Sequence, residues 1–285
     1  MSAQPNTRRK RFLVNRVLSE GIPGVQRTAF IRSLIAGVGA VELTHISPAL
    51  AGIDEPSVGR EVFAQLREDG ELLFDSEYYE HLNEIGSVIA QTVVSRYPYP
   101  IRYYIVRGDS ANAFSVPGGN IYVNEPLLRL AKNRDELAGV LAHETGHMVL
   151  HHVAQHMNAL QKKNTAAQIG SILAQIVLGP LAGAAVDYGS QYAVAGSDAA
   201  QSRHIEAQAD EEGARIMAAT GQFNPWGMVW FFQIMTESYG PGQNFWLRDH
   251  PLDQQRITDL ANEFRDNPTV FGKYKDTQQK DVAYW

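Results

Sequence analysis

The segment His143-Glu144-Thr145-Gly146-His147 has the residue types and spacing of a metal-assisted hydrolase. In a helix, positions i and i+4 lie on one face, one turn apart, so both imidazoles can bind the same ion. Neutral imidazole suits zinc, and zinc lowers the pKa of a bound water to about 7. Glu144 is placed to take a proton from such a water. The motif therefore predicts one Zn²⁺ held by His143 and His147, with Glu144 as the general base.

The setting of this motif separates a catalytic helix from a surface helix with incidental histidines. Leu137, Val140 and Leu141 precede the motif at helical spacing and predict a buried helix. Unpaired ionisable residues in such a helix would be costly. A shared metal ion is the interpretation that explains them.

A catalytic zinc needs a third protein ligand, and Glu206 is the best candidate. Glu206 and Asp210 have i, i+4 spacing, so one can bind zinc while the other hydrogen-bonds a ligand histidine. The small residues Ala207 and Ala209 would let this helix approach the first one closely. A solvated acidic face is the alternative, since two more glutamates follow directly.

Three further histidines follow the motif but do not complete a longer metal signature. The pattern H-E-x-x-H-x-x-G-x-x-H needs glycine at 150 and histidine at 153, where this chain has Leu150 and Val153. His151 would lie about 12 Å along the helix axis from His143. We therefore interpret as helix-surface residues His151, His152 and His156.

Four blocks of sequence together resemble a known family. In order, between about Gly59 and Phe264, they are Asn112–Val123, Leu141–His147, Glu206–Asp210 and His250–Arg256. They are similar to the zinc metallopeptidases that group the CAAX prenyl protease, the membrane protease HtpX and the periplasmic β-barrel assembly-enhancing protease. One block would be weak support; four in order are specific.

The resemblance implies roles for several residues. Zinc would be bound by His143, His147 and Glu206, and Asp210 would orient a ligand histidine. The residues expected to form an edge strand that pairs with the substrate backbone are Gly119, Asn120, Ile121, Tyr122 and Val123.

The late His250-Pro251 also matches the family. In periplasmic members this histidine can approach the zinc and block the water position, which gives a latent state. Asp249 replaces the usual Ser or Thr before it, and a capping or surface histidine is the alternative interpretation. Either His250 or Arg256 could assist the oxyanion, and the sequence does not choose between them.

The periodicity predicts an α+β fold, a helix-dominated zincin of the gluzincin type. Its small β-sheet is expected to place an edge strand above the helix of the motif. We expect helices at 61–65, 78–94, from Leu137 to about Met157, at 202–219 and after Asn224-Pro225, strands at 101–106 and 120–124, and a turn at 117–119. Leu82, Ile85, Ile89 and Val93 form one apolar stripe.

Composition limits the classes of function. The 285 residues contain no cysteine, which excludes disulfides and thiolate metal sites. Residues 1–51 hold seven Lys or Arg and two acids, whereas the rest holds 18 basic and 29 acidic residues. Because nucleic-acid affinity rests on neutralising phosphates, the acidic charge of residues 52–285 argues against nucleic-acid binding. The expected parts are a targeting segment at 1–51, a peptidase domain at 52–270 and a tail at 271–285.

Two segments bear on localisation. The chain begins with a basic region, which is followed by the weakly apolar residues 34–41 and by the small-residue cleavage signature Ala49-Leu50-Ala51. This order predicts a signal peptide, with a mature chain that starts at Gly52 in a bacterial periplasm. A mitochondrial presequence and a retained basic arm are the alternatives. Residues 164–186 carry no charge, but glycines and a proline interrupt them, which favours an apolar loop or helical hairpin over a membrane span. Peripheral contact of this segment with lipid remains an expectation.

Taken together, the sequence predicts a zinc endopeptidase that cleaves unfolded or misassembled proteins in envelope quality control. The outer-membrane assembly machinery is an expected partner. The alternative is a chaperone-like binder of unfolded envelope proteins with little or latent proteolysis. The general base Glu144 argues against a pure binder, which has no need of it.

Overall fold

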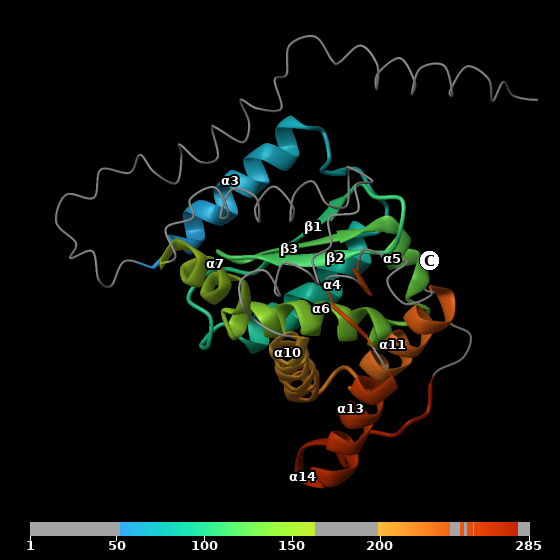
Figure 1. Ribbon diagram of the computed structural model, residues 1–285. Coiled ribbons are helices and arrows are strands. Elements are labelled where there is room, and N and C mark those ends of the chain that lie inside the picture. The colour runs from blue at the N-terminus through green and yellow to red at the C-terminus, as the bar shows by residue number, and fades with distance from the viewer. Residues whose placement is uncertain (1–51, 163–198, 240–245, 248–249, 253, 279–285) are drawn as a thin grey trace, which may run out of the picture. The chain divides into compact units, whose positions relative to one another are not determined.

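The computed structural model describes residues 52–162, 199–239, 246–247, 250–252 and 254–278 (Figure 1). They belong to a compact unit that spans Ile46–Trp285. Both the expected targeting segment and the uncharged segment 164–186 lie outside the described residues. The elements are α3 (Glu55–Glu68), α4 (Tyr79–Thr92), β1 (Arg102–Val106), β2 (Ala113–Val116), β3 (Asn120–Asn124), α5 (Glu125–Leu130), α6 (Arg134–Val149), α7 (His152–Lys162), α10 (Ala199–Thr220), α11 (Trp226–Ser238), α13 (Gln254–Asp266) and α14 (Pro268–Phe271).

The three described strands form one sheet in the order β1-β3-β2. β1 pairs with β3 in parallel, and β2 pairs with β3 antiparallel. The tight turn between β2 and β3 depends on Gly118 and Gly119, whose φ angles are 95° and 100°. A side chain at Gly119 would also collide with the Pro100 carbonyl. Glycine is the residue that reaches this conformation without strain.

The strand predicted at 120–124 has the right bounds, but its expected place at the sheet edge is wrong. β3 is the central strand, with hydrogen-bonded neighbours on both sides. The local pattern showed a strand but could not show that the distant segment Arg102–Val106 pairs along its second side. Among the described strands, β1 and β2 are the edges.

Helix α6 runs through the middle of the unit. The sheet contacts one side of it, while α10 and α11 pack against other sides (Figure 1). Every residue from Glu136 to Val149 is buried, as expected for a helix surrounded by protein. Asn133 caps it, because its Oδ1 accepts a hydrogen bond of 2.9 Å from the Glu136 amide. Asn133 is therefore the N-cap of α6.

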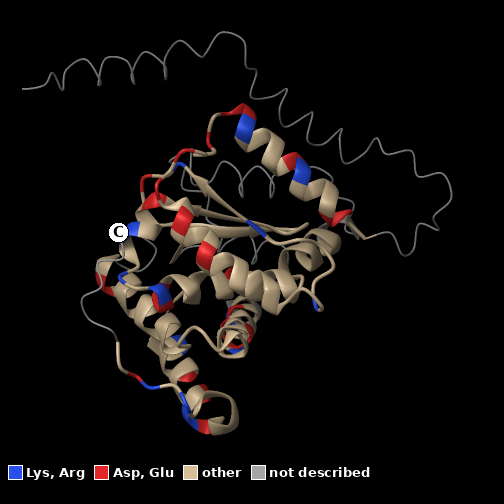
Figure 2. Ribbon diagram, turned by 180° about the vertical axis from the view of Figure 1, so that it is seen from behind, with Lys and Arg blue, Asp and Glu red and all other residues tan. Residues whose placement is uncertain are grey.

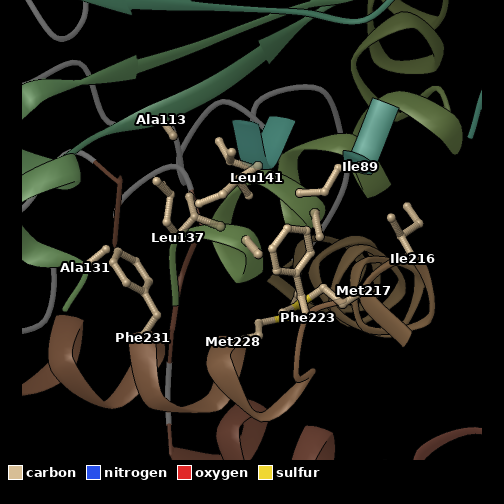
Figure 3. Close-up of a cluster of buried hydrophobic side chains, with 14 of the residues drawn as sticks. Ile89, Ala113, Ala131, Leu137, Leu141, Ile216, Met217, Phe223, Met228 and Phe231 are labelled. Carbon is tan, nitrogen blue, oxygen red and sulfur yellow. The ribbon is translucent and has the colours of Figure 1, made fainter. Parts of the chain in front are cut away.

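The apolar core surrounds α6. Figure 3 shows Leu137 and Leu141 of α6 between Ala113 of β2, Ile89 of α4 and residues of α10 and α11. The predicted apolar stripe is confirmed, because its three residues on α4 and Val93 directly after α4 are at most 1% exposed. In Figure 2, charged residues gather on the helices and connections, whereas the strands are almost uncharged. The helix that carries the metal-binding motif is therefore surrounded by apolar side chains.

The prediction of one helix from Leu137 to about Met157 is wrong. α6 ends at Val149 and α7 begins at His152. Between them His151 has a φ of 55°, a left-handed conformation that ends the α-helix. The break redirects the chain, so helical spacing counted from His143 no longer applies after Leu150.

The described part of the expected C-terminal tail packs against the domain. Phe271 is 1% exposed within the core. The Trp230 indole donates to Asp276 at 2.8 Å, and the Gln278 amide donates to Glu136 at 2.7 Å. Within the described parts of the chain, no helix is long and apolar enough to cross a membrane.

Candidate metal centre

Four buried side chains offer ligand atoms at one point, namely those of His143, His147, Glu206 and His250. Their ligand atoms all lie within 4.8 Å of one another. The Nε2 atoms of His143 and His147 are 3.1 Å apart. Glu206 places its Oε2 atom 3.4 Å from His143 Nε2 and its Oε1 atom 3.5 Å from His147 Nε2. The structure thus brings together the three residues expected to bind zinc.

The donor set fits zinc. Ligand atoms that bind one zinc tetrahedrally at about 2.0–2.1 Å lie about 3.3 Å from each other. The observed separations are close to this value. His143 Nδ1 lies 2.9 Å from Asp210 Oδ1, which favours a proton on Nδ1 and leaves a lone pair on Nε2. Two imidazole lone pairs and a carboxylate facing one point are the ligands that a zinc ion requires.

Close packing of α10 against α6 delivers Glu206 and Asp210. A Cβ atom on Gly146 would lie 2.8 Å from the Ala209 carbonyl oxygen, so the backbones touch where glycine is. Ala209 is fully buried at this contact, as predicted, but Ala207 is exposed and takes no part. The interpretation of 206–212 as a solvated acidic face is wrong for Glu206 and Asp210, which are buried at the metal set.

Arg256 locks the acids in place. Its Nε and Nη2 atoms donate to the two oxygens of Asp210, each at 2.9 Å, and its Nη1 donates to the Pro251 carbonyl at 2.7 Å. The same Nη1 lies 3.3 Å from Glu206 Oε2. This guanidinium therefore joins α13, the His250 loop and α10. Since its three nitrogens already have partners, it is a poor donor for an oxyanion.

Glu144 is placed and charged as a general base must be. Burial raises the pKa of its carboxyl group, but the interactions with His250 above all, and with His143 and His147, lower it by more, to about 2. Glu144 Oε1 lies 3.2 Å from His250 Nε2 and 3.4 Å from the Trp246 indole nitrogen. Its Oε2 is buried without a hydrogen-bond partner. Glu144 is thus an ionised carboxylate with one oxygen free to accept a proton.

His250 lies in the metal set rather than on the surface. Its Nδ1 is 3.0 Å from Glu206 Oε2 and 3.2 Å from His143 Nε2. The Trp246 ring packs against it with centroids 5.0 Å apart. Burial lowers the pKa of His250, yet the carboxylates of Glu206 and Glu144 raise it well above its usual value. The surface interpretation of His250 is therefore excluded.

The interpretation of His152 as a surface residue is wrong. His152 is buried, and its Nδ1 lies 3.0 Å from Nδ1 of His147. Burial and the neighbouring His147 lower the pKa of His152 to about 3, so it is neutral. The helix break at His151 turns His152 back toward the ligand. His151 itself contacts Glu55, with Nδ1 2.7 Å from Oε1, and His156 is half-buried.

Asn112 begins the first of the four sequence blocks, and the sequence alone predicts no role for its side chain. It is 2% exposed, and neither its Oδ1 nor its Nδ2 has a hydrogen-bond partner. Leaving a buried polar group unpaired costs about 1–3 kcal/mol. Asn112 directly precedes β2, and its backbone is fixed by hydrogen bonds to Asn124. The free amide is available to a ligand.

The comparisons with known proteins agree with this geometry. The model of peptidase family M48 matches residues 79–264, more than half of the chain. The chain belongs to peptidase family M48. The buried metal set and this membership make it a zinc metalloendopeptidase.

Three relatives illustrate the range of the family. A beta-barrel assembly-enhancing protease of Yersinia pestis is 30% identical over 236 residues, which cover 80% of this chain and 48% of the relative. The mitochondrial metalloendopeptidase OMA1 of Schizosaccharomyces pombe is 30% identical over 174 residues, or 54% of this chain and 45% of the relative. The metalloprotease LoiP of Escherichia coli is 27% identical over 205 residues, which cover 70% of this chain and 73% of the relative. This chain spans about half the length of the first two.

Proposed function

We propose that this protein is an endopeptidase that cleaves unfolded or misassembled proteins in the bacterial envelope. The observation that carries the proposal is the buried set of His143, His147 and Glu206 with ionised Glu144 beside it. A bound zinc supplies Lewis-acid polarisation of the peptide carbonyl and a more acidic water. Glu144 would accept a proton from the attacking water at its free oxygen and pass it to the leaving amine. Asp210 and Arg256 keep the ligands in place throughout.

The substrate backbone pairs with β2, not with β3. Of the segment expected to bind substrate, Gly119 lies in the turn before β3 and Asn120–Val123 lies in the central strand β3, whose two hydrogen-bonding sides are both paired. β2 contacts α6 and, among the described strands, pairs only with β3. A peptide added along its other edge would form the antiparallel or parallel pairing seen in β-augmentation. The unpaired amide of Asn112, at the start of β2, would then bind a main-chain group of the substrate.

The envelope role is supported by the names of relatives. Relatives called beta-barrel assembly-enhancing proteases favour misassembled proteins as substrates and the outer-membrane assembly machinery as a partner, in the periplasm. The likeness to mitochondrial metalloendopeptidases supports the mitochondrial alternative. Fractionation of cells that express the full chain with a C-terminal tag distinguishes the two.

A latent enzyme is the second candidate, and the position of His250 favours it. The His250 ring touches the metal set through Nδ1 and the general base through Nε2. A ring in this place can occupy the position that water needs. The protein would then bind unfolded clients and cleave them only after the loop moves.

The proposed activity is tested with Glu144→Gln. Zinc content, thermal unfolding and casein cleavage are measured for the wild type, with and without chelator, and for the variant. Because Glu144 is the base and no ligand, we expect normal zinc content and a loss of cleavage of about a hundredfold or more. Unchanged cleavage by Glu144→Gln contradicts the mechanism. Cleavage by the chelated wild type contradicts the metal requirement.

The third ligand is tested with Glu206→Ala. This change removes one of three protein ligands, so zinc stoichiometry should fall well below one per chain. Normal stoichiometry would show that another residue binds the metal. Glu211→Ala, an exposed neighbour on the same helix, is the matched control and should keep its zinc.

A further inference from the structure

The two carboxylate oxygens of Glu144 have different surroundings. Oε1 lies 3.4 Å from the indole nitrogen of Trp246 and 3.2 Å from Nε2 of His250. Oε2 is buried and has no hydrogen-bond partner. Both neighbouring nitrogen atoms therefore gather at one oxygen, and the other oxygen is left to accept a proton.

Of these two neighbours, Trp246 is the one that can only donate. An indole nitrogen carries a hydrogen and no acceptor lone pair, so its hydrogen bond to Glu144 has one direction. A histidine nitrogen donates or accepts according to its tautomer and charge. The bond from Trp246 to Oε1 can therefore persist before and after Glu144 takes up a proton, provided that the proton joins Oε2. At 3.4 Å it is long, as hydrogen bonds of catalytic groups often are before a substrate binds.

Aromatic rings surround the fully buried side chain of Trp246. The ring of Phe232 in α11 is tilted by 45° against the indole, with centroids 5.6 Å apart, and the ring of Phe231 is nearly perpendicular to it at 6.1 Å. The ring of the ligand His143 in α6 lies 5.8 Å away. Tilted and edge-to-face contacts are favoured arrangements of aromatic rings. Contacts with α6 and α11 thus direct the indole N–H toward Glu144.

Trp246 and Glu144 also satisfy each other. A buried indole N–H requires an acceptor, and among the described residues Oε1 of Glu144 is that acceptor. A buried carboxylate in turn requires donors, because it has lost its contact with water. Removing the N–H would therefore leave Oε1 with one donor fewer and would loosen the orientation of the carboxylate.

We propose that Trp246 is a positioning residue of the peptidase reaction, whose indole N–H holds Oε1 of Glu144 so that Oε2 receives the proton of the attacking water. The inference rests on the proposed role of Glu144 as general base and deepens it. The O–H bond of the water breaks and its proton joins Oε2. The proton then moves from Oε2 to the nitrogen of the leaving amine, so Glu144 ends the cycle ionised. A base that is already oriented toward the proton it takes lowers the barrier of this step.

The test compares variants of the full-length, zinc-loaded protein on unfolded, fluorescently labelled casein. Trp246 is replaced by phenylalanine and, in a second variant, by benzothienylalanine, in which sulfur takes the place of the indole N–H. The second variant keeps the size and shape of the ring, so it remains informative if Trp246→Phe does not fold. We expect both variants to keep the zinc content and KM of the wild type. We expect kcat to fall about tenfold or more in both, as for one lost hydrogen bond to a charged group.

The matched control is Trp230→Phe. Trp230 lies in α11, and its indole donates to a different carboxylate, that of Asp276, at 2.8 Å. This change also removes one indole N–H from a carboxylate, but not from the general base. Its kcat and KM should equal those of the wild type, even where its denaturant midpoint is lower.

Two results would overturn the role of Trp246. Wild-type kcat in the benzothienylalanine variant would show that the N–H does not position Glu144, and an inactive Glu144→Gln would leave the general base in place. A higher kcat would show that Trp246 instead holds the next turn over the water position, since its carbonyl accepts from the His250 amide at 2.7 Å. If the zinc-loaded wild type does not cleave casein, the proposed function itself fails, and the role of Trp246 fails with it.

Discussion

At the scale of single residues, the metal centre works because each ionisable group has a defined partner. His143 faces Asp210 through one ring nitrogen and the metal position through the other. Asp210 in turn is fixed by Arg256. Such outer partners orient ligands and keep their tautomers. Glu144 Oε2 and the side-chain amide of Asn112 are buried without a hydrogen-bond partner, so a water or a substrate can bind to them.

His152 should strengthen zinc binding without touching the ion. To bind zinc through Nε2, His147 must carry its proton on Nδ1, and neutral His152 can accept that hydrogen bond across the observed 3.0 Å. We expect His152→Ala to weaken zinc about 10–100-fold. His152→Gln, whose carbonyl can accept the same bond, should recover part of the affinity. Competition with a chromophoric chelator measures it.

The control is the adjacent His151→Ala, because His151 contacts Glu55 and no ligand. Its zinc affinity should equal that of the wild type. Equal affinities for the His152 and His151 variants would show that the contact between His152 and His147 has no effect on the metal.

Replacing His250 by alanine distinguishes between two roles of this residue, blocking the water position and assisting the transition state. If His250 blocks the water position, His250→Ala should raise basal cleavage, by about tenfold for a blocked state favoured by about 1.4 kcal/mol. If His250 assists the transition state, cleavage falls while zinc stays bound. Turnover of an unfolded substrate, measured beside zinc content, decides between them. A lower rate would contradict latency.

At the scale of elements, the contact between α6 and α10 places the third ligand. Gly146→Ala would put a methyl group 2.8 Å from the Ala209 carbonyl, and backbone cannot move aside as a flexible side chain can. We expect a loss of about 1–3 kcal/mol in the free energy of unfolding, as for other overpacked contacts. Because the helix that moves carries Glu206, zinc affinity should fall as well. Denaturant unfolding and zinc titration test both, and an unchanged zinc affinity would show that α10 does not need this approach.

Elements defined by local pattern could be predicted from the sequence, whereas their neighbours could not. The strand at Asn120–Asn124 and the apolar stripe on α4 follow from alternation and helical spacing. The central place of β3 depends on pairing with a segment eighteen residues earlier, and local patterns do not specify such pairing. The end of α6 depends on one left-handed residue, His151, which carries no glycine or proline signal. Because the sequence did not predict this break, it did not predict the contact of His152 with His147 either.

At the scale of the whole molecule, the metal centre is inserted into a core that other segments complete. Phe271 and Tyr274 extend the apolar core beyond the last predicted helix, and Gln278 reaches back to Glu136 at the start of α6. The three ligands expected for zinc could be found from the sequence because two share one helix turn and the third follows a family pattern. The contacts of the C-terminal residues could not be predicted from the sequence, because their partners lie up to 142 residues away along the chain.

The charges buried in this core predict opposite pH behaviour for the metal-free and zinc-loaded protein. In the metal-free chain, burial lowers the pKa of His250, but Glu206 and Glu144 raise it well above 6.5. A group with a raised folded pKa gives stability that is complete below its unfolded pKa and is lost as pH rises through the folded value. Chelated protein should therefore lose stability as the pH is raised from about 6.5 toward 9, by at most about 1.4 kcal/mol per pH unit for this one proton. Zinc-loaded protein should not lose stability in this way, because zinc requires neutral imidazoles and binds more tightly as protons leave.

Denaturant midpoints at pH 6.5 and 9, with and without chelator, measure the difference. His250→Gln should remove most of the loss in the chelated protein, and an equally steep loss in that variant would show that the buried charge lies elsewhere.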